Sequence, residues 1–379
     1  MRKKILIIGH NYATQFIDIY NQYIRLFNHT DFEVTVAYLT GTPNETVRQR
    51  TLTNEVLFLN ASKKSIRGLK IKPIRQLLSL CREKSFHMVI CHRYKPTYIM
   101  MWVALLHKIP ALIFVMHELK TMSSLGRKLL TACLNRRNML FAGVSNAVRD
   151  DLRKHLWNVP KDRIITLYNM IDVELTEPQL YSREEARKLL PLPDPMGGSD
   201  TFLFGNLARL VPNKDHENLI RSFALIKPFC PNAKLIIIGN GILESSLKEQ
   251  VASLDLSKDV IFTGYLANGF RYMKALDCFV LSSVQEAFGR VLLEAMIAHC
   301  PIIATKTHGI PEVVGEAGIL VKPGDTHELA QIMKKIYSLS LTEREKIGQK
   351  AYAHMLANYA IPIFHQQFWQ LPLAHLLRE

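Results

Sequence analysis

The sequence lacks several features that would define its class at once. No apolar run is long enough to span a bilayer, because the longest apolar neighbourhood, residues 96–116, is interrupted by His107, Lys108 and Pro110. The apolar run that follows the first basic residues stops after four positions, so the N-terminus predicts a buried strand and not a signal peptide. The six cysteines form no Cys-x-x-Cys pair, which indicates reduced thiols in a cytosolic protein.

Three chemical motifs are also missing. No Asp-x-Asp occurs, which argues against a metal ion held by neighbouring carboxylates. No Gly-x-Gly-x-x-Gly follows an apolar run, so a dinucleotide oxidoreductase is poorly supported. No recognised nucleic-acid-binding motif appears, and we expect no nucleic acid partner.

Negative charge is scarce in the first half of the chain. The formal net charge is +15; residues 1–180 hold 27 Lys and Arg against 13 Asp and Glu, and the remainder holds 21 against 20. The excess is densest at residues 63–75, with six basic residues in thirteen and no acid. A solvated basic face explains any single lysine, but the asymmetry as a whole favours an anionic surface such as a phosphate-bearing lipid as partner.

What is present is two series of short apolar runs separated by amphipathic stretches. Such alternation predicts the α/β class, with two doubly wound, Rossmann-like parallel-sheet domains facing a central cleft. Between the series, residues 191–200 pack three prolines and two glycines into ten positions, which indicates a linker. The predicted strands lie at 3–9, 32–39, 55–60, 86–92, 111–117, 139–145 and 163–169, then at 201–207, 234–241, 259–266, 278–283, 301–307 and 317–323.

Ligands of open parallel sheets bind beyond the carboxyl ends of the strands, and unusual polar residues follow these runs. Arg209 and Lys214 follow the first strand of the second series, five positions apart across a turn. Two cations on such a loop suit a pyrophosphate, because Arg can bind two oxygens at once and Lys is a mobile point charge. An ordinary basic loop explains this stretch equally well.

The stretch QEAFGRVLLEAMIAHCPIIAT, residues 285–305, places Glu286 and Glu294 eight positions apart in otherwise apolar sequence. The pattern of AFGRVLLEAMIAH, residues 287–299, predicts a helix, with Glu286 in the loop before it and Glu294 in its third turn. A helix start offers N–H groups to phosphate, Gly289 allows close backbone approach, and carboxylates accept bonds from sugar hydroxyls. The plain alternative makes Glu286 a helix cap and Glu294 a surface residue.

These stretches resemble the donor-site segment of family 4 retaining glycosyltransferases of the group 1 type, which have the GT-B fold. Residues 285–325, ending GIPEVVGEAGILVKPGD, carry the Glu-x7-Glu pair, and residues 205–220, GNLARLVPNKDHENLI, are similar to the family's Arg/Lys diphosphate loop. KLIIIGNG and VIFTGYL match the intervening strands in order, while AGVSNAVRDDL and LYNMIDVE resemble the end of its first domain. Ordered matches cover most of residues 140–325, and residues 1–140 match only in pattern.

The resemblance implies a role for each of these residues. Arg209 and Lys214 would hold the donor diphosphate and, with Glu286, take part in catalysis by stabilising the leaving group and the transferred sugar. Glu286 would bind the sugar hydroxyls and Glu294 the nucleotide ribose. His117 would be a catalytic residue that faces the sugar, although a buried structural histidine is an alternative. Further donor contacts are expected from Gly9, Gly239, Phe288, Gly289 and Arg290.

The first half departs from the family pattern in two places. The family's first loop usually has adjacent glycines, whereas here Gly9 is followed by His10 and Asn11, which leaves the acceptor geometry least defined. CHRYKPTYI, from residue 91, is equally individual. Its aromatic and basic residues would line an acceptor groove, or, slightly favoured, Tyr94 and Tyr98 simply pack.

The expected domains are an acceptor-side domain over 1–180, a linker over 181–200, a donor-binding domain over 201–358, and a C-terminal helix over 359–379 that returns to the first domain. The expected function is retaining transfer of a hexose from a nucleotide diphosphate sugar, most readily a UDP-sugar, to lipopolysaccharide core or a lipid-linked oligosaccharide. We expect no cofactor and no metal, and a cytoplasmic enzyme on the inner face of the membrane. A soluble acceptor, or a non-catalytic sugar-nucleotide-binding protein, is the alternative; the intact Arg209, Lys214, Glu286 and Glu294 set counts against the latter.

Overall fold

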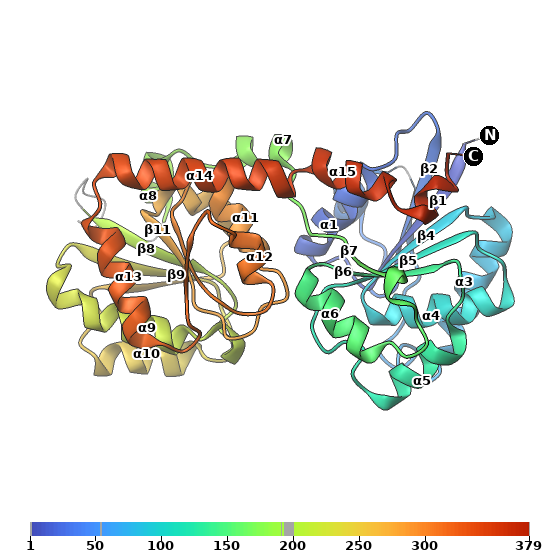
Figure 1. Ribbon diagram of the computed structural model, residues 1–379, viewed down its shortest axis with the longest axis horizontal. Coiled ribbons are helices and arrows are strands. Elements are labelled where there is room, and N and C mark those ends of the chain that lie inside the picture. Colours follow the sequence, from blue (N-terminus) through green and yellow to red (C-terminus); the bar gives the residue numbers. More distant parts are fainter. Residues whose placement is uncertain (1, 54, 191, 193–200, 379) are drawn as a thin grey trace. The chain divides into compact units, whose positions relative to one another are not determined.

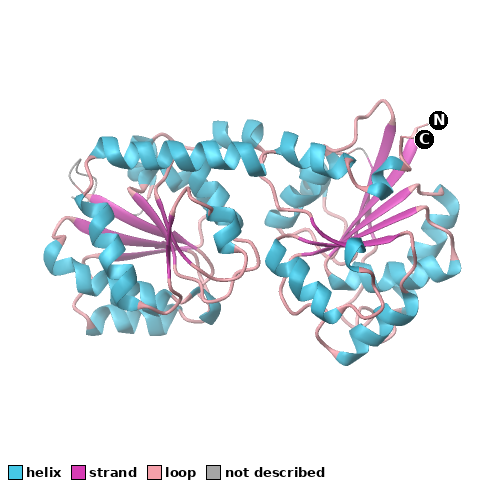
Figure 2. Cartoon of the chain, viewed as in Figure 1, coloured by secondary structure: helices cyan, strands magenta, loops and turns pink. Residues whose placement is uncertain are grey.

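A computed structural model of the chain describes residues 2–53, 55–190, 192 and 201–378. Its contacts divide into two compact units, one formed by Met1–Asn169 with Ile361–Glu379 and the other by Met170–Ala360. Figure 2 shows that in each unit the strands form a central layer with helices on both faces. Each of the thirteen predicted apolar runs contains a strand of one of the two sheets. Continuous apolar strands need helices on both faces of their sheet, and they have them here, so the predicted α/β class is confirmed.

The first unit contains a seven-stranded sheet in the order β3-β2-β1-β4-β5-β6-β7, and every pair is parallel. The order reverses between β1 and β4, so the loops that leave these two strands diverge at the carboxyl edge. The strands are β1 (Lys3–Gly9), β2 (Phe32–Tyr38), β3 (Glu55–Phe58), β4 (Met88–His92), β5 (Ala111–Met116), β6 (Met139–Gly143) and β7 (Ile164–Thr166).

One helix of this unit is buried over most of its surface. It is α4 (Tyr94–Leu106), which packs against both α3 (Ile71–Lys84) and α5 (Leu125–Leu134). Helix α4 begins just after β4, where the strand order of the sheet reverses (Figure 1). The other helices are α1 (Thr14–Ile24), α2 (Glu45–Arg50), α6 (Asn146–His155), α15 (Ile361–Trp369), α16 (Pro372–His375) and the 3-10 turn η1 (Lys161–Arg163).

The second unit contains a six-stranded parallel sheet in the order β10-β9-β8-β11-β12-β13. Its order reverses between β8 and β11, and because these two strands are neighbours, the loops that follow them begin side by side at the carboxyl edge. The strands are β8 (Phe202–Leu207), β9 (Ala233–Ile238), β10 (Val260–Gly264), β11 (Cys278–Leu281), β12 (Ile302–Thr305) and β13 (Ile319–Val321). The helices are α7 (Val173–Thr176), α8 (Arg183–Leu189), α9 (His216–Ile226), α10 (Glu244–Ser253), α11 (Arg290–Ile297), α12 (Ile310–Val314), α13 (Thr326–Ser338) and α14 (Leu341–Tyr359), with 3-10 turns η2 (Glu177–Gln179), η3 (Pro212–Lys214), η4 (Lys227–Phe229) and η5 (Gly269–Ala275).

The segment predicted as a linker, 181–200, includes helix α8. Asp277 fastens this helix to the second unit, because its buried carboxylate accepts bonds from Arg183 Nη2 at 2.7 Å and Arg187 Nη2 at 2.8 Å. The same carboxylate accepts the Leu203 N–H of β8 at 2.8 Å. Residues 181–190 therefore pack on the second unit, while the Pro/Gly-rich residues 191 and 193–200 lie outside the described residues.

The last residues of the chain pack on the first unit. Phe364 and Phe368 of α15 are buried, and their rings meet Tyr23 at 5.1 Å and Phe27 at 5.7 Å. Trp369 Nε1 donates to the Leu26 carbonyl at 3.2 Å. Tertiary contacts of this kind explain why α14 and α15, consecutive in sequence (Figure 1), belong to different units.

Within the described ranges, no helix combines the length and apolarity that a membrane crossing would require. The six cysteines are all free, and Cys133 is the exposed one among them.

Candidate functional site

The loop after β8 carries the two predicted diphosphate ligands. Arg209 is exposed, and Lys214 is half-buried at the end of the turn η3. Asp215, which follows, takes a left-handed conformation and caps α9 by accepting the Asn218 N–H at 3.4 Å. The cap lets the chain change direction directly after Lys214, so the lysine side chain stays at the carboxyl edge of the sheet.

The loop after β11 meets this loop and pairs with it. Lys214 Nζ bonds the Glu286 carboxylate, and the two side chains are only 15% and 16% exposed, so water screens the pair little. Ser282 Oγ donates to the Lys214 carbonyl at 2.9 Å, and Asn213 Nδ2 donates to the Gln285 carbonyl at 3.1 Å. Two residues 72 positions apart in sequence are thus held as one constellation before any ligand binds.

The start of α11 lies beside Glu286. Gly289, its N-cap, has φ +87°, a conformation that favours glycine, and no side chain caps the helix. Its first turn holds no acidic residue, so an anion there would meet the positive end of the helix without competition. Phe288 is buried against the ring of Tyr359 at 5.7 Å, which leaves only its backbone for a ligand. The helix begins at Arg290, so Glu294 lies in its second turn and not in the predicted third.

Gly239 and Gly241 have a packing reason to be glycine. At Gly239, with φ +143°, a Cβ would stand 2.0 Å from the Ala208 carbonyl oxygen, and at Gly241 one would stand 2.3 Å from the Leu210 carbonyl oxygen. The loop after β9 therefore lies directly on the backbone that flanks Arg209. Any ligand role of Gly239 comes in addition to this positioning of the arginine loop.

In the first unit, the predicted residue Gly9 ends β1 and the predicted residue His117 follows β5. Gly9 lies against Tyr20, whose ring atoms would be 2.5 Å from a Cβ at that position. His117 is half-buried, and its Nε2 lies 3.0 Å from Nδ1 of His92, the last residue of β4. Burial and the neighbouring His117 lower the pKa of His92 well below its usual value, so His92 is neutral at pH 7.

Of the aromatic and basic residues after β4, some pack in the interior and others line a cavity. Tyr98 is buried, as the favoured interpretation of the sequence had it, and Lys70 Nζ lies 3.8 Å from its ring centroid. Tyr94 instead lines a cavity of about 300 Å³ that also includes His10, His117 and four cations. Lys120 and Arg127 of this group could not be found from the sequence, because they come from a loop and a helix further along the chain.

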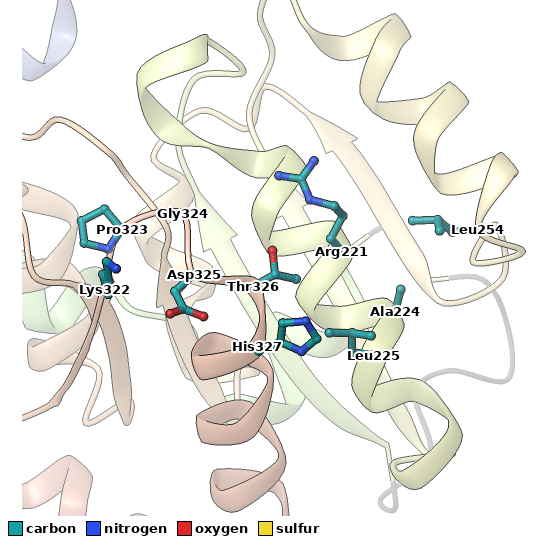
Figure 3. A pocket seen from close by; sticks show the side chains of 10 residues that line it. All are labelled: Arg221, Ala224, Leu225, Leu254, Lys322, Pro323, Gly324, Asp325, Thr326 and His327. Carbon is teal, nitrogen blue, oxygen red and sulfur yellow. The ribbon is translucent and has the colours of Figure 1, made fainter.

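A larger hollow of about 620 Å³ lies elsewhere on the second unit, as Figure 3 shows. Arg221 and Leu225 from α9 face the start of α13, where Thr326 and His327 lie. None of the predicted donor residues lines it. Among the residues that the structure describes, no group of three or more His, Cys, Asp or Glu side chains is arranged to hold a metal ion.

Comparison with known proteins gives the class and then the family. The crystal structure of the Anabaena protein HepE in complex with UDP and glucose superimposes with a TM-score of 0.76, at 21% identity, over 97% of this chain and 98% of that one. Together with the two parallel sheets, this likeness defines a GT-B fold. A family model for glycosyl transferases group 1 matches residues 197–354, and one for glycosyltransferase family 4 matches residues 23–175. Together the two models cover most of the chain, which therefore carries the signature of the family 4, group 1 glycosyltransferases.

Two relatives illustrate how far the sequence similarity extends. An uncharacterized glycosyltransferase of Methanocaldococcus jannaschii is 35% identical over 140 residues, which are 33% of this chain and 34% of the relative, so this match spans about a third of either protein. The N-acetylgalactosamine-N,N'-diacetylbacillosaminyl-diphospho-undecaprenol 4-alpha-N-acetylgalactosaminyltransferase of Campylobacter jejuni is 27% identical over 313 residues, covering 79% of this chain and 80% of the relative.

Proposed function

We propose that the chain transfers a hexosyl group, with retention of anomeric configuration, from a nucleotide diphosphate sugar to a membrane-associated glycan. The observation that carries this proposal is the Lys214–Glu286 pair beside the uncapped start of α11. A cation, a carboxylate and a helix N-terminus suit diphosphate and sugar hydroxyls at once. A UDP-sugar is the favoured donor, since the similar HepE binds UDP and glucose.

The chemistry follows from where charge develops. As the glycosidic bond breaks, negative charge accumulates on the departing diphosphate, and Arg209, Lys214 and the start of α11 would stabilise it without a metal ion. Because Glu286 already holds Lys214, the ammonium group is ordered before the donor arrives. Donor binding therefore costs little further conformational freedom of the lysine side chain. Glu286 would then orient the sugar through its hydroxyls, and Glu294 would bind the ribose. We name no protein nucleophile.

A membrane-associated acceptor is supported by the first unit. Leu69 and Ile71 are 68% and 54% exposed, and they lie among the exposed cations Lys63, Lys64 and Arg67. Apolar side chains surrounded by positive charge suit the surface of an anionic bilayer. The name of the Campylobacter relative specifies a diphospho-undecaprenol acceptor. A lipid-linked oligosaccharide is therefore favoured over lipopolysaccharide core, with the protein on the cytoplasmic face of the membrane.

The proposal is tested by thermal unfolding with UDP-, GDP- and ADP-sugars, each with and without EDTA. A ligand that binds the native state raises its unfolding temperature. We expect a clear rise with one UDP-sugar that EDTA does not change, followed by release of UDP when a prenyl-diphosphate-linked saccharide is added. A rise that EDTA removes would contradict metal-free binding. No rise with any donor at millimolar concentration would contradict the donor site itself.

A further inference from the structure

The cavity of about 300 Å³ in the first unit has no role in the proposed donor chemistry. It lies at the carboxyl edge of the sheet, beyond β1, β4 and β5, where the strand order reverses. Its volume is at the lower end of ligand sites, and therefore suits a small head group. His117 lines the same cavity, so a group bound there lies next to the residue expected to face the transferred sugar.

The cavity is strongly positive. Four cations line it, Arg93, Lys95, Lys120 and Arg127, against one carboxylate, Glu118. Glu118 is bonded by Arg93 Nη2 at 2.9 Å and so compensates one cation. In the part of the chain that the structure describes, the side chains of the other three have no carboxylate within ion-pair distance. The cavity therefore keeps a net positive charge that these protein groups do not balance.

The cations are close enough to repel one another. Burial, then the charges of Arg93 and Arg67, lower the pKa of Lys95. Burial, then Lys95 and Arg127, lower the pKa of Lys70 behind it. A bound anion would relieve this repulsion, which is the reason that clustered cations of a folded protein mark an anion site.

The backbone adds to the same potential. Arg93, the N-cap of α4, has φ +74°, no side chain caps this helix, and its first turn holds no acidic residue. The positive end of a thirteen-residue helix therefore opens where Tyr94 and Lys95 line the cavity. Arg127 is fixed beside it, with its guanidinium 4.0 Å from the centroid of the Tyr94 ring and a bond to the Thr121 carbonyl.

We propose that this cavity binds the phosphate or diphosphate of the acceptor, seated between Lys95, Arg127 and the start of α4. The inference rests on the proposed function and adds the chemistry that selects its acceptor. A glycan linked through diphosphate would place its charged group in the cavity and its sugar beside His117. A phosphate-free glycan would leave the three uncompensated cations without an anion, so it would bind more weakly.

The first experiment is calorimetric titration of the full chain with inorganic pyrophosphate in saturating UDP, which occupies the donor residues. We expect the wild type to bind pyrophosphate under these conditions, Lys95→Gln to weaken binding at least about tenfold, and Lys95→Gln/Arg127→Gln to abolish it. Lys128→Gln is the matched control, because Lys128 lies on α5 over the Trp157 ring and does not line the cavity. Arg127→Lys, which keeps the charge, should retain binding.

The outcomes separate this inference from the donor site. If UDP does not bind, the proposed function fails, and the cavity is tested in an Arg209→Gln/Lys214→Gln protein without UDP. Loss of pyrophosphate binding in saturating UDP would assign the anion to the donor site and overturn the inference. Equal binding by the Lys95→Gln/Arg127→Gln protein would overturn it as well.

A second titration distinguishes the source of the phosphate. We expect Lys95→Gln/Arg127→Gln to weaken binding of a prenyl-diphosphate-linked monosaccharide about tenfold and to leave the methyl glycoside of the same sugar unchanged. Equal effects on both would contradict recognition of the acceptor phosphate. If the substitutions instead reduce binding to phosphatidylglycerol vesicles and not to the soluble diphosphate, the cations belong to a membrane surface, and the inference is wrong.

Discussion

His92 and His117 form a pair of imidazoles in which Nδ1 of the buried His92 lies 3.0 Å from Nε2 of His117. The rings of Tyr20 and Tyr23 enclose His92 at 5.1 and 4.6 Å, and His92 Nε2 has no partner among the described residues. Because His92 is neutral, a proton on its Nδ1 leaves only a lone pair, not an N–H group, unsatisfied. His117 Nε2 then accepts, and His117 carries its own proton on Nδ1.

We expect His92→Phe, which keeps the aromatic packing but removes the hydrogen bond, to lower kcat about tenfold while leaving the donor KM unchanged. His92→Asn, which retains a polar group, should recover part of the loss. Nitrogen chemical shifts of the imidazoles report the tautomer of His117 directly. An unchanged His117 spectrum and unchanged kcat in folded His92→Phe would show that His92 only fills space.

Glu286→Ala should abolish transfer, with a loss of about a hundredfold or more, while the protein stays folded. The substitution removes both the expected sugar contact and the group that holds Lys214. Product formation from a UDP-sugar is measured beside far-UV circular dichroism. Glu316→Ala, at an exposed position after α12, is the matched control. Near-normal turnover by folded Glu286→Ala would remove Glu286 from the donor site.

Asp277→Ala should lower the free energy of unfolding by about 3 kcal/mol, because it leaves Arg183, Arg187 and the more distant Arg344 without their buried partner. The loss should include detachment of α8, which Arg183 and Arg187 tie to the second unit. Urea denaturation measures the first effect, and faster amide exchange over 183–189 measures the second. Arg221→Ala, whose contact with Glu217 is exposed and 3.9 Å long, should change stability by less than about 1 kcal/mol.

His216 should make the protein less stable in mild acid. It is fully buried, its Nε2 donates to Asn206 Oδ1 at 3.0 Å, and burial followed by Lys214 lowers its pKa to about 4. The unfolded histidine binds a proton below about pH 6.5 and the folded one does not, so stability is lost as the pH falls from 6.5 toward 4. We expect His216→Gln to reduce the slope of stability against pH in this window by up to roughly 1.4 kcal/mol per pH unit. An identical slope in denaturation at pH 6.5, 5.5 and 4.5 would contradict this.

Binding to anionic vesicles should depend on the basic segment before α3. Replacing Lys63, Lys64 and Arg67 by Gln should weaken binding to phosphatidylglycerol vesicles several-fold, and 0.5 M salt should do the same to the wild type. Sedimentation with vesicles measures both effects. Lys258→Gln on the second unit, also exposed, is the control. Binding that neither change affects would remove the electrostatic argument for a membrane partner.

The sheets could be predicted from the sequence because each strand is a short apolar run with its own local signal, as in KKILIIG and KLIIIGNG. The Arg209, Lys214, Glu286 and Glu294 set was assigned through the resemblance of two stretches to a known family, since the spacing alone left plain alternatives open. The ion pair between Lys214 and Glu286 could not be predicted, because this contact depends on β8 and β11 being neighbours in the sheet. The start of α11 was misplaced because the left-handed Gly289 ends the loop later than the apolar periodicity indicates. The cations Lys120 and Arg127 carry no local signal, since only the fold brings them beside Lys95.

The packing of α15 on the first unit has a consequence for how the protein is made. The second unit, Met170–Ala360, is one continuous stretch, whereas the first unit needs residues from both ends of the chain. Domains fold as units while they emerge from the ribosome. Phe364, Phe368 and Trp369 are synthesised after the whole second unit, so the unit that is translated first is the one whose core is completed last. Until then, the aromatic surface around Tyr23 and Phe27 is uncovered on the nascent chain.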